Sequence, residues 1–264
     1  MRILITNDDG VYARGLWALA EALQPLGEVI VVAPDREQSG VGTSVTLHHP
    51  VRASAVTPQI PGIETYAVEG TPADSVILGL RTLTRDVDML FSGINEGANL
   101  GNDALISGTV GGALQGFFHG LPSTALSVTT LEVSHFEVAA NLGLLLGDMV
   151  LRKLIPRDIL LNVNVPNKPI SEIDAMEITK LGRRSYVDII DEGHDGKRKY
   201  YWIVRGKPTW DVVEGTDIWA VRNGRISITP LHDDLTNRAQ TSILQDQRAP
   251  MMDALRQGTS QSSR

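Results

Sequence analysis

The sequence predicts an α/β fold in which a doubly wound, mostly parallel sheet carries a β-rich C-terminal extension and a final helix. Two observations support this prediction. Short apolar segments alternate with segments of helical periodicity through the first half of the chain. The apolar segments are continuous rather than alternating, which is typical of strands that are buried on both faces of a parallel sheet.

The first strand, helix and strand are expected near the N-terminus. Residues 3–6 form a short β-branched run, apolar residues recur at helical spacing over 16–23, and residues 29–33 form a continuous apolar run that ends at Pro34. The alternation then continues. Strands are expected at residues 89–91, 124–128 and 159–165, and helices from Thr71-Pro72, over about 110–119, and over about 136–151.

The character of the chain changes after Pro166. Residues 177–186 and 199–204 read as strands of a hairpin or extension, separated by the polar stretch 191–196, and residues 241–255 read as a final helix. We therefore expect a Rossmann-like catalytic core over residues 1–166. A β-rich extension, a return to the core and a C-terminal helix involved in oligomerisation are expected over 167–257, with a disordered tail over 258–264.

Composition narrows the classes of function. The chain has 264 residues, a formal net charge of −7 and no cysteine. The acidic balance argues against binding a nucleic-acid duplex, and the lack of cysteine excludes disulfides and thiol nucleophiles. No apolar segment near the N-terminus is long enough for a signal peptide or a spanning helix. We expect a cytoplasmic protein with no membrane partner.

Three unusually polar turns are the candidate site. They are Asn7-Asp8-Asp9-Gly10, the segment 35–40 with Ser39 and Gly40, and the segment 92–103 with Asn95 and Asn99. Ligands of an open parallel sheet bind beyond the carboxyl ends of its strands, where such turns lie. The three turns are therefore expected at one edge of the sheet.

The adjacent carboxylates Asp8 and Asp9 suggest a metal site. Two carboxylates in a partly desolvated turn repel each other, and a divalent cation removes that cost. Oxygen ligands favour magnesium, manganese or calcium over zinc. The alternative is a helix cap, since Asp is a favoured N-cap residue.

The third turn combines glycines with asparagines and leads to a helix start at Ser107-Gly108-Thr109, which suits oxyanion binding. A plain surface loop of the same composition is the alternative. Thr71-Pro72-Ala73-Asp74 is explained by helix capping alone. The six histidines show no ligand spacing on a helix, so none is expected to bind metal.

Together these segments resemble the stationary-phase survival protein SurE family of metal-dependent nucleotidases, over nearly the whole chain. The matching motifs are residues 3–10, 33–40, 70–74, 92–101, 107–110 and 229–231.

The resemblance implies that Asp8, Asp9, Ser39 and Asn95 hold one divalent metal cation. It also implies hydrolysis of nucleoside 5′- and 3′-monophosphates, activity on short polyphosphate, and homodimers or homotetramers in which the C-terminal segment reaches a neighbouring subunit. Within this hypothesis Asp8 and Asp9 are catalytic through the metal. The residues expected to hold the phosphate are Gly40, Asn99, Ser107, Gly108 and Thr109.

One departure from the family concerns residues 103–106, which read Asp-Ala-Leu-Ile where related sequences tend to carry aromatic residues. Three rival functions stay open at this stage. They are a signalling receiver module, an enzyme that uses Asp8 or Asp9 as a covalent nucleophile, and a nucleotide-binding module without turnover.

Overall fold

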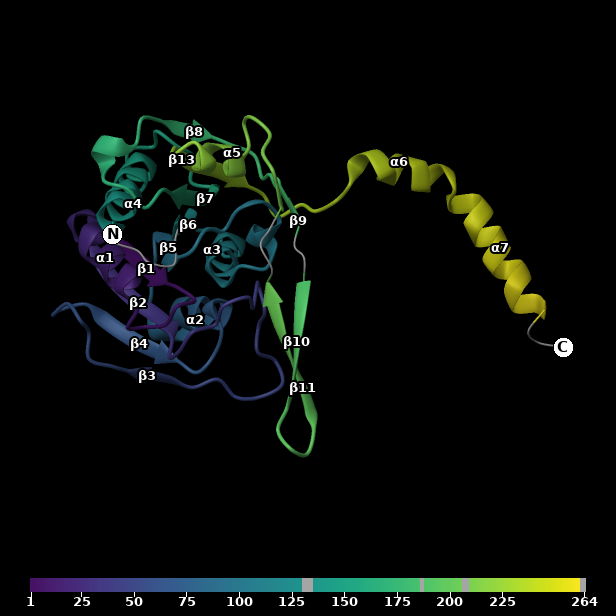
Figure 1. Ribbon diagram of the computed structural model, residues 1–264, viewed down its shortest axis with the longest axis horizontal. Helices are drawn as coiled ribbons and strands as arrows, with labels where there is room; N and C mark the ends of the chain where they lie inside the picture. The colour runs from purple at the N-terminus through teal and green to yellow at the C-terminus, as the bar shows by residue number, and fades with distance from the viewer. Residues whose placement is uncertain (130–134, 186–187, 206–208, 262–264) are drawn as a thin grey trace. The chain divides into compact units, whose positions relative to one another are not determined.

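A computed structural model describes residues 1–129, 135–185, 188–205 and 209–261 (Figure 1). The chain divides into two compact units, Met1–Leu231 and His232–Arg264. In the part of the chain described, no helix is long and apolar enough to cross a membrane. The first unit extends beyond residue 166, which is the expected limit of the core.

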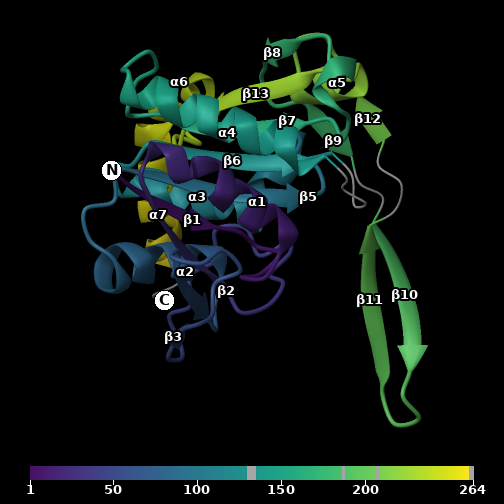
Figure 2. The same ribbon diagram turned by 90° about the vertical axis from the view of Figure 1, so that its left-hand side faces the viewer.

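Within the described residues, nine strands of the first unit form one sheet (Figures 1 and 2). In spatial order they are β3 (Ala53–Ala55), β4 (Glu64–Val68), β2 (Glu28–Pro34), β1 (Arg2–Thr6), β5 (Met89–Glu96), β6 (Ser123–Val128), β7 (Leu160–Val165), β13 (Ile226–Leu231) and β8 (Met176–Ile178). From β4 to β7 every neighbouring pair is parallel, which confirms the predicted fold class. β3 and β13 run antiparallel to β4 and β7.

Helices cover both faces of this sheet (Figure 2). They are α1 (Arg14–Leu23) and α4 (Phe136–Leu151) on one face, and α2 (Pro72–Leu78) and α3 (Gly108–Phe118) on the other. α5 (Asp217–Arg222) lies against β13 and β7. Short turns of 3-10 or π helix are η1 (Gln24–Leu26), η2 (Gly79–Leu83), η3 (Gly101–Leu105) and η4 (Ile170–Glu172).

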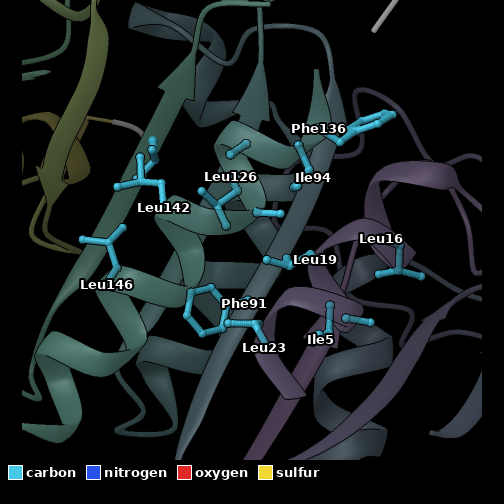
Figure 3. Close-up of a cluster of buried hydrophobic side chains, with 14 of the residues drawn as sticks. Ile5, Leu16, Leu19, Leu23, Phe91, Ile94, Leu126, Phe136, Leu142 and Leu146 are labelled. Carbon is cyan, nitrogen blue, oxygen red and sulfur yellow. The ribbon is translucent and has the colours of Figure 1, made fainter. Parts of the chain in front are cut away.

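The larger hydrophobic core lies between the sheet and the pair α1 and α4 (Figure 3). Phe91 and Leu126 of the sheet pack there with Leu19 of α1 and Leu142 of α4. Strand residues whose side chains point to the other face of the sheet, such as Leu90, belong to the second core beneath α2 and α3. Side chains of a strand alternate between its faces, so both faces of each central strand are apolar.

The C-terminal half of the first unit differs from the expected hairpin. The strand that pairs with β11 (Lys199–Arg205) is β10 (Asp188–His194), which includes much of the polar stretch expected as a connection. Of the expected strand 177–186, part belongs to β8 in the main sheet and part to β9 (Arg183–Ser185), which pairs with β12 (Thr209–Asp211). Tyr186 lies outside the described residues.

The second unit contains α6 (Arg238–Asp246) and α7 (Arg248–Gln261) rather than the single expected helix over 241–255. The side chain of Asn237 caps α6. Pro250 lies in the first turn of α7, where a missing backbone N–H costs nothing, so the helix starts again there. α7 continues to Gln261, into the segment expected as a tail; residues 262–264 lie outside the described residues.

Candidate functional site

The first polar turn is held closed by Asn7. The side chain of this buried residue donates a hydrogen bond to the Gly10 carbonyl at 3.0 Å and accepts one from the Gly10 amide at 3.2 Å. Gly10 has φ +104°, and a Cβ there would lie 3.3 Å from the Arg36 carbonyl carbon. A left-handed conformation in so close a contact favours glycine. The turn therefore presents Asp8 and Asp9 in a fixed position after β1.

Asp8 is the point at which the second turn and the start of α3 meet the first turn. Its carbonyl oxygen accepts a hydrogen bond from the Gln38 amide at 2.7 Å, and its Oδ1 accepts one from the Thr109 hydroxyl at 2.5 Å. A Cβ added to Gly108 would lie 2.8 Å from the Asp8 Cβ, so the start of α3 rests directly on the carboxyl. Together with the bond from the Glu96 amide of the third turn to Asp9, these contacts place the three turns at one edge of the sheet.

Asp8 is buried and Asp9 is half-buried, and neither has a cationic partner among the described residues. Only 4 % of Asp8 is exposed, and burial raises its pKa although the bond from Thr109 opposes the shift. Burial, followed by the charge of Asp8, raises the pKa of Asp9 to about 7. In the described ranges, neither carboxyl forms an ion pair with lysine or arginine. A bound cation would offset this electrostatic cost.

Asn95 precedes Glu96, the last residue of β5, whose amide binds Asp9. The pairing of β5 with β6 shifts register between Ser92 and Asn95, and the next amide, that of Glu96, donates to Asp9 Oδ2 at 3.3 Å. The Asn95 Nδ2 donates to the Gly97 carbonyl at 2.7 Å. That bond orients the side-chain amide and leaves its Oδ1 as an oxygen ligand.

Ser39 follows the residue whose amide binds Asp8. It is exposed, and its hydroxyl donates to Glu37 Oε1 at 2.7 Å. A donating hydroxyl oxygen keeps its lone pairs for a cation. Two of the four expected ligands are thus the acidic pair itself. The other two, Ser39 and Asn95, are next in the chain to Gln38 and Glu96, whose amides donate to the pair.

The donor set at this edge fits a hard divalent cation. Its candidate ligand atoms are the carboxylate, hydroxyl and amide oxygens of Asp8, Asp9, Ser39 and Asn95. Among the residues that the structure describes, no three His, Cys, Asp or Glu side chains are grouped to hold a metal ion. A cation here would depend on two carboxylates completed by neutral oxygens.

The expected phosphate-binding residues lie in three places: the start of α3, the second turn and the buried part of the third turn. Ser107 is the N-cap of α3, where its Oγ accepts from the Val110 amide at 3.1 Å, and the amides of Gly108 and Thr109 form the first turn beside Asp8. Gly40 is exposed, with φ +74°, in the second turn. The Asn99 side chain is buried and donates to Ser127 Oγ at 2.9 Å, so it is already engaged inside the protein.

Two residues that the sequence analysis did not single out hold the third turn. Asn162 and Asn164 of β7 both donate from their side chains to the Asn99 carbonyl, at 2.8 and 3.2 Å. Asn164 also accepts from the Asn99 amide at 2.9 Å. Both side chains are fully buried. Two asparagines within an otherwise apolar strand are a signal by which the sequence could have indicated them.

Comparison with known proteins agrees with this geometry. A family model described as "Survival protein SurE" matches residues 3–188. The chain is 46 % identical over 259 residues to a protein named 5'-nucleotidase SurE from Dehalococcoides mccartyi strain CBDB1, covering 97 % of this chain and 98 % of the relative. It is 50 % identical over 248 residues to a protein of the same name from Geobacter sulfurreducens, covering 93 % of each chain.

A crystal structure titled as the SurE protein from Aquifex aeolicus has a similar fold. Its TM-score is 0.75 at 43 % sequence identity, and the match covers 90 % of this chain and 95 % of that one. The matched family model, the identities over nearly the full length and the shared fold together show that this chain belongs to the survival protein SurE family.

Proposed function

We propose that this chain is a metal-dependent 5′-nucleotidase, which hydrolyses the phosphomonoester bond of a nucleoside monophosphate to nucleoside and phosphate. The observation that carries the proposal is the pair of buried Asp8 and half-buried Asp9, which meets two further polar turns without a cationic partner in the described part of the chain. The relatives named 5'-nucleotidase SurE support the choice of substrate.

The metal ligands in this proposal are Asp8, Asp9, Ser39 and Asn95. Two carboxylates balance the charge of one magnesium, manganese or calcium ion, and the hydroxyl and amide ligands add none. The cation with its two aspartates then carries no net charge to repel a phosphate dianion. When bound, such an ion acts as a Lewis acid on a phosphate oxygen and lowers the pKa of a coordinated water.

The chain's own residues orient the carboxylates and the phosphate. The Thr109 hydroxyl fixes Asp8, and the Glu96 amide fixes Asp9. The amides of Gly108 and Thr109 begin α3, and free N–H groups at a helix N-terminus bind anionic oxygens. They would hold the phosphate against the acidic edge, and solvent would supply the proton for the leaving oxygen.

The finer parts of the proposal concern substrate range and assembly. We infer activity on nucleoside 3′-monophosphates and on short-chain polyphosphate as well, because a site built around a phosphate group makes few demands on the leaving group. A homodimer or homotetramer in the cytoplasm completes the proposal. The exposed apolar side chains of Leu244, Met251 and Leu255 in the second unit support self-association.

The test compares two variants of the acidic pair with a surface control. Asp8→Asn and Asp9→Asn should each abolish phosphate release from a nucleoside 5′-monophosphate and weaken manganese binding measured by calorimetry, with the circular dichroism spectrum unchanged. Asp148→Asn, which removes a carboxylate paired with Arg152 on α4, should leave both measurements unchanged. Turnover retained in both acidic-pair variants would overturn the proposal.

A further inference from the structure

Asp217 is a buried carboxylate far along the chain from the acidic pair. It is the first residue of α5, its side chain is fully buried, and it lies in the segment that returns to the sheet before β13. Thr216 caps the helix, because its Oγ1 accepts from the Trp219 amide at 3.2 Å. Asp217 is therefore not needed as the cap, and its carboxyl is directed elsewhere.

Both oxygens of Asp217 are used by backbone amides. Oδ2 accepts from the Gly101 amide at 2.7 Å, while Oδ1 accepts from the Gly182 amide at 2.7 Å and the Ile218 amide at 2.8 Å. The carboxyl thus joins the glycine-rich third turn to the segment before β9. Burial raises the pKa of Asp217, and these amide bonds oppose the shift.

The packing around the Asp217 carboxyl leaves little room for Gly101 or Gly182 to move. Gly101 has φ +54°, and a Cβ there would lie 2.7 Å from the Gly182 carbonyl oxygen. A Cβ on Gly182 would lie 2.7 Å from Ile218 Cδ1 and 3.1 Å from Asp217 Oδ1. Two glycine backbones therefore lie against one carboxyl and one buried isoleucine.

Gly101 is connected to the acidic pair by a short series of bonds. It begins η3, within which the Asp103 carbonyl accepts from the amides of Ile106 and Ser107, at 3.1 and 3.0 Å. Ser107 then caps α3, and Thr109 of that helix donates to Asp8. The position of Gly101 thus sets the approach of the chain to the N-terminus of α3.

We propose that Asp217 is a positioning residue for hydrolysis, which fixes η3 through the Gly101 amide and so holds the first turn of α3 against Asp8. The proposal rests on the proposed function, because α3 and Asp8 belong to that site. Asp217 touches neither substrate nor metal in this arrangement. Its effect is transmitted through the backbone of residues 101–109.

The direct test is Asp217→Asn in the full-length chain. The Gly101 and Gly182 amides donate to different oxygens of the carboxyl, and asparagine replaces one of these oxygens with a donor NH2 group, so one of the two bonds is lost. Thr216→Ala is the matched control, because it weakens the start of the same helix and touches neither glycine. Gly182→Ala is a second variant that retains the carboxyl and crowds its Oδ1, and it serves if Asp217→Asn fails to fold.

Two measurements separate positioning from general destabilisation. Hydrogen exchange followed by mass spectrometry should show faster exchange over residues 99–109 in Asp217→Asn and Gly182→Ala, but not in Thr216→Ala. Phosphate release, measured with saturating manganese well below each melting temperature, should show at least a tenfold loss of kcat/KM in Asp217→Asn. A misplacement of about 1 Å can cost about a hundredfold in rate, so a tenfold loss corresponds to a smaller displacement. Thr216→Ala should stay within twofold of the unchanged protein.

The outcomes distinguish this proposal from the function on which it rests. Exchange confined to α5 and residue 182, or equal kcat/KM in Asp217→Asn and Thr216→Ala, would overturn the positioning role while the enzyme remains a nucleotidase. If the protein without any substitution releases no phosphate, the proposed function is refuted. Hydrogen exchange over residues 99–109 would then still decide whether Asp217 orders the third turn.

Discussion

The partly desolvated acidic pair Asp8 and Asp9 predicts a distinctive pH dependence of stability for the protein after chelation of divalent cations. Burial and the neighbouring Asp8 charge raise the pKa of Asp9 from 3.8 to about 7. Between these two values the folded chain holds a proton that the unfolded chain has released. The free energy of unfolding therefore falls as the pH rises through this range.

The size of the effect follows from the shift. Each pKa unit corresponds to about 1.4 kcal/mol, so raising the pH from about 5 to about 7 should remove roughly 2 to 3 kcal/mol. For a chain of this length each kcal/mol lowers the melting temperature by about 2–4 °C. The pKa values of Asp8 and Asp217 are raised as well, so they add to the slope in the same direction.

Asp9→Asn isolates the contribution of Asp9, because asparagine keeps the shape and has no titrating proton. We would follow thermal unfolding by circular dichroism in excess chelator at several pH values for both proteins. The unchanged chain should lose roughly 5 to 10 °C between about pH 5 and about pH 7, and the variant clearly less. Manganese at neutral pH should restore the unchanged chain, because a cation binds the ionised carboxylates. Equal slopes in the two proteins, or a melting temperature that rises with pH, would refute this reasoning.

Three further predictions concern packing. Gly108→Ala places a Cβ 2.8 Å from the Asp8 Cβ and should lower phosphate release about a hundredfold. The control is Gly143→Ala in α4, whose added Cβ meets only core side chains, and it should not lower phosphate release. Equal activity of the two variants in steady-state assays would contradict the prediction. Thr71→Ala removes the α2 capping box and should cost about 1 kcal/mol in chemical denaturation, and a loss below a few tenths would count against the cap. Leu126→Ala should cost about 2–5 kcal/mol by cavity formation in the core of Figure 3, and denaturation midpoints close to those of the unchanged chain would contradict that.

Segments with a strong local pattern could be predicted from the sequence alone. The helix α4 and the strands β6 and β7 appear where helical periodicity and continuous apolar runs indicated them, within one residue of the expected bounds. The capping signature at Thr71 is confirmed by hydrogen bonds in both directions with Asp74. In these segments the local sequence and the buried environment favour the same structure.

Other features depend on contacts between distant residues and leave little local signal. β10 includes Asp191, Glu192 and Gly193. Over residues 190–194 burial does not alternate along the strand, so the sequence there lacks the period-two pattern that indicates a strand. β13 lies between β7, to which it is antiparallel, and β8, to which it is parallel, and no turn or period of the sequence specifies this placement.

At the site, the sequence indicated the three turns because their polar composition is unusual. It did not indicate which side chains face one another. The bond from the Thr109 hydroxyl to Asp8 joins residues 101 positions apart. The amide and hydroxyl of Thr109 were both expected to bind phosphate, and in the structure the hydroxyl donates to this carboxyl while the amide lies in the first turn of α3. Such a pairing emerges only when the sheet brings both chain segments together.

The bond between Gly101 and Asp217 also bears on synthesis of the protein. It joins residues 116 positions apart, so the Gly101 amide cannot form this bond until that length of chain has been translated. At about 5–20 residues per second this interval is roughly 6 to 23 s. A nascent chain that already contains all three polar turns would therefore still have a loosely held α3 start. We expect the completed site to form only as the last strand of the sheet leaves the ribosome.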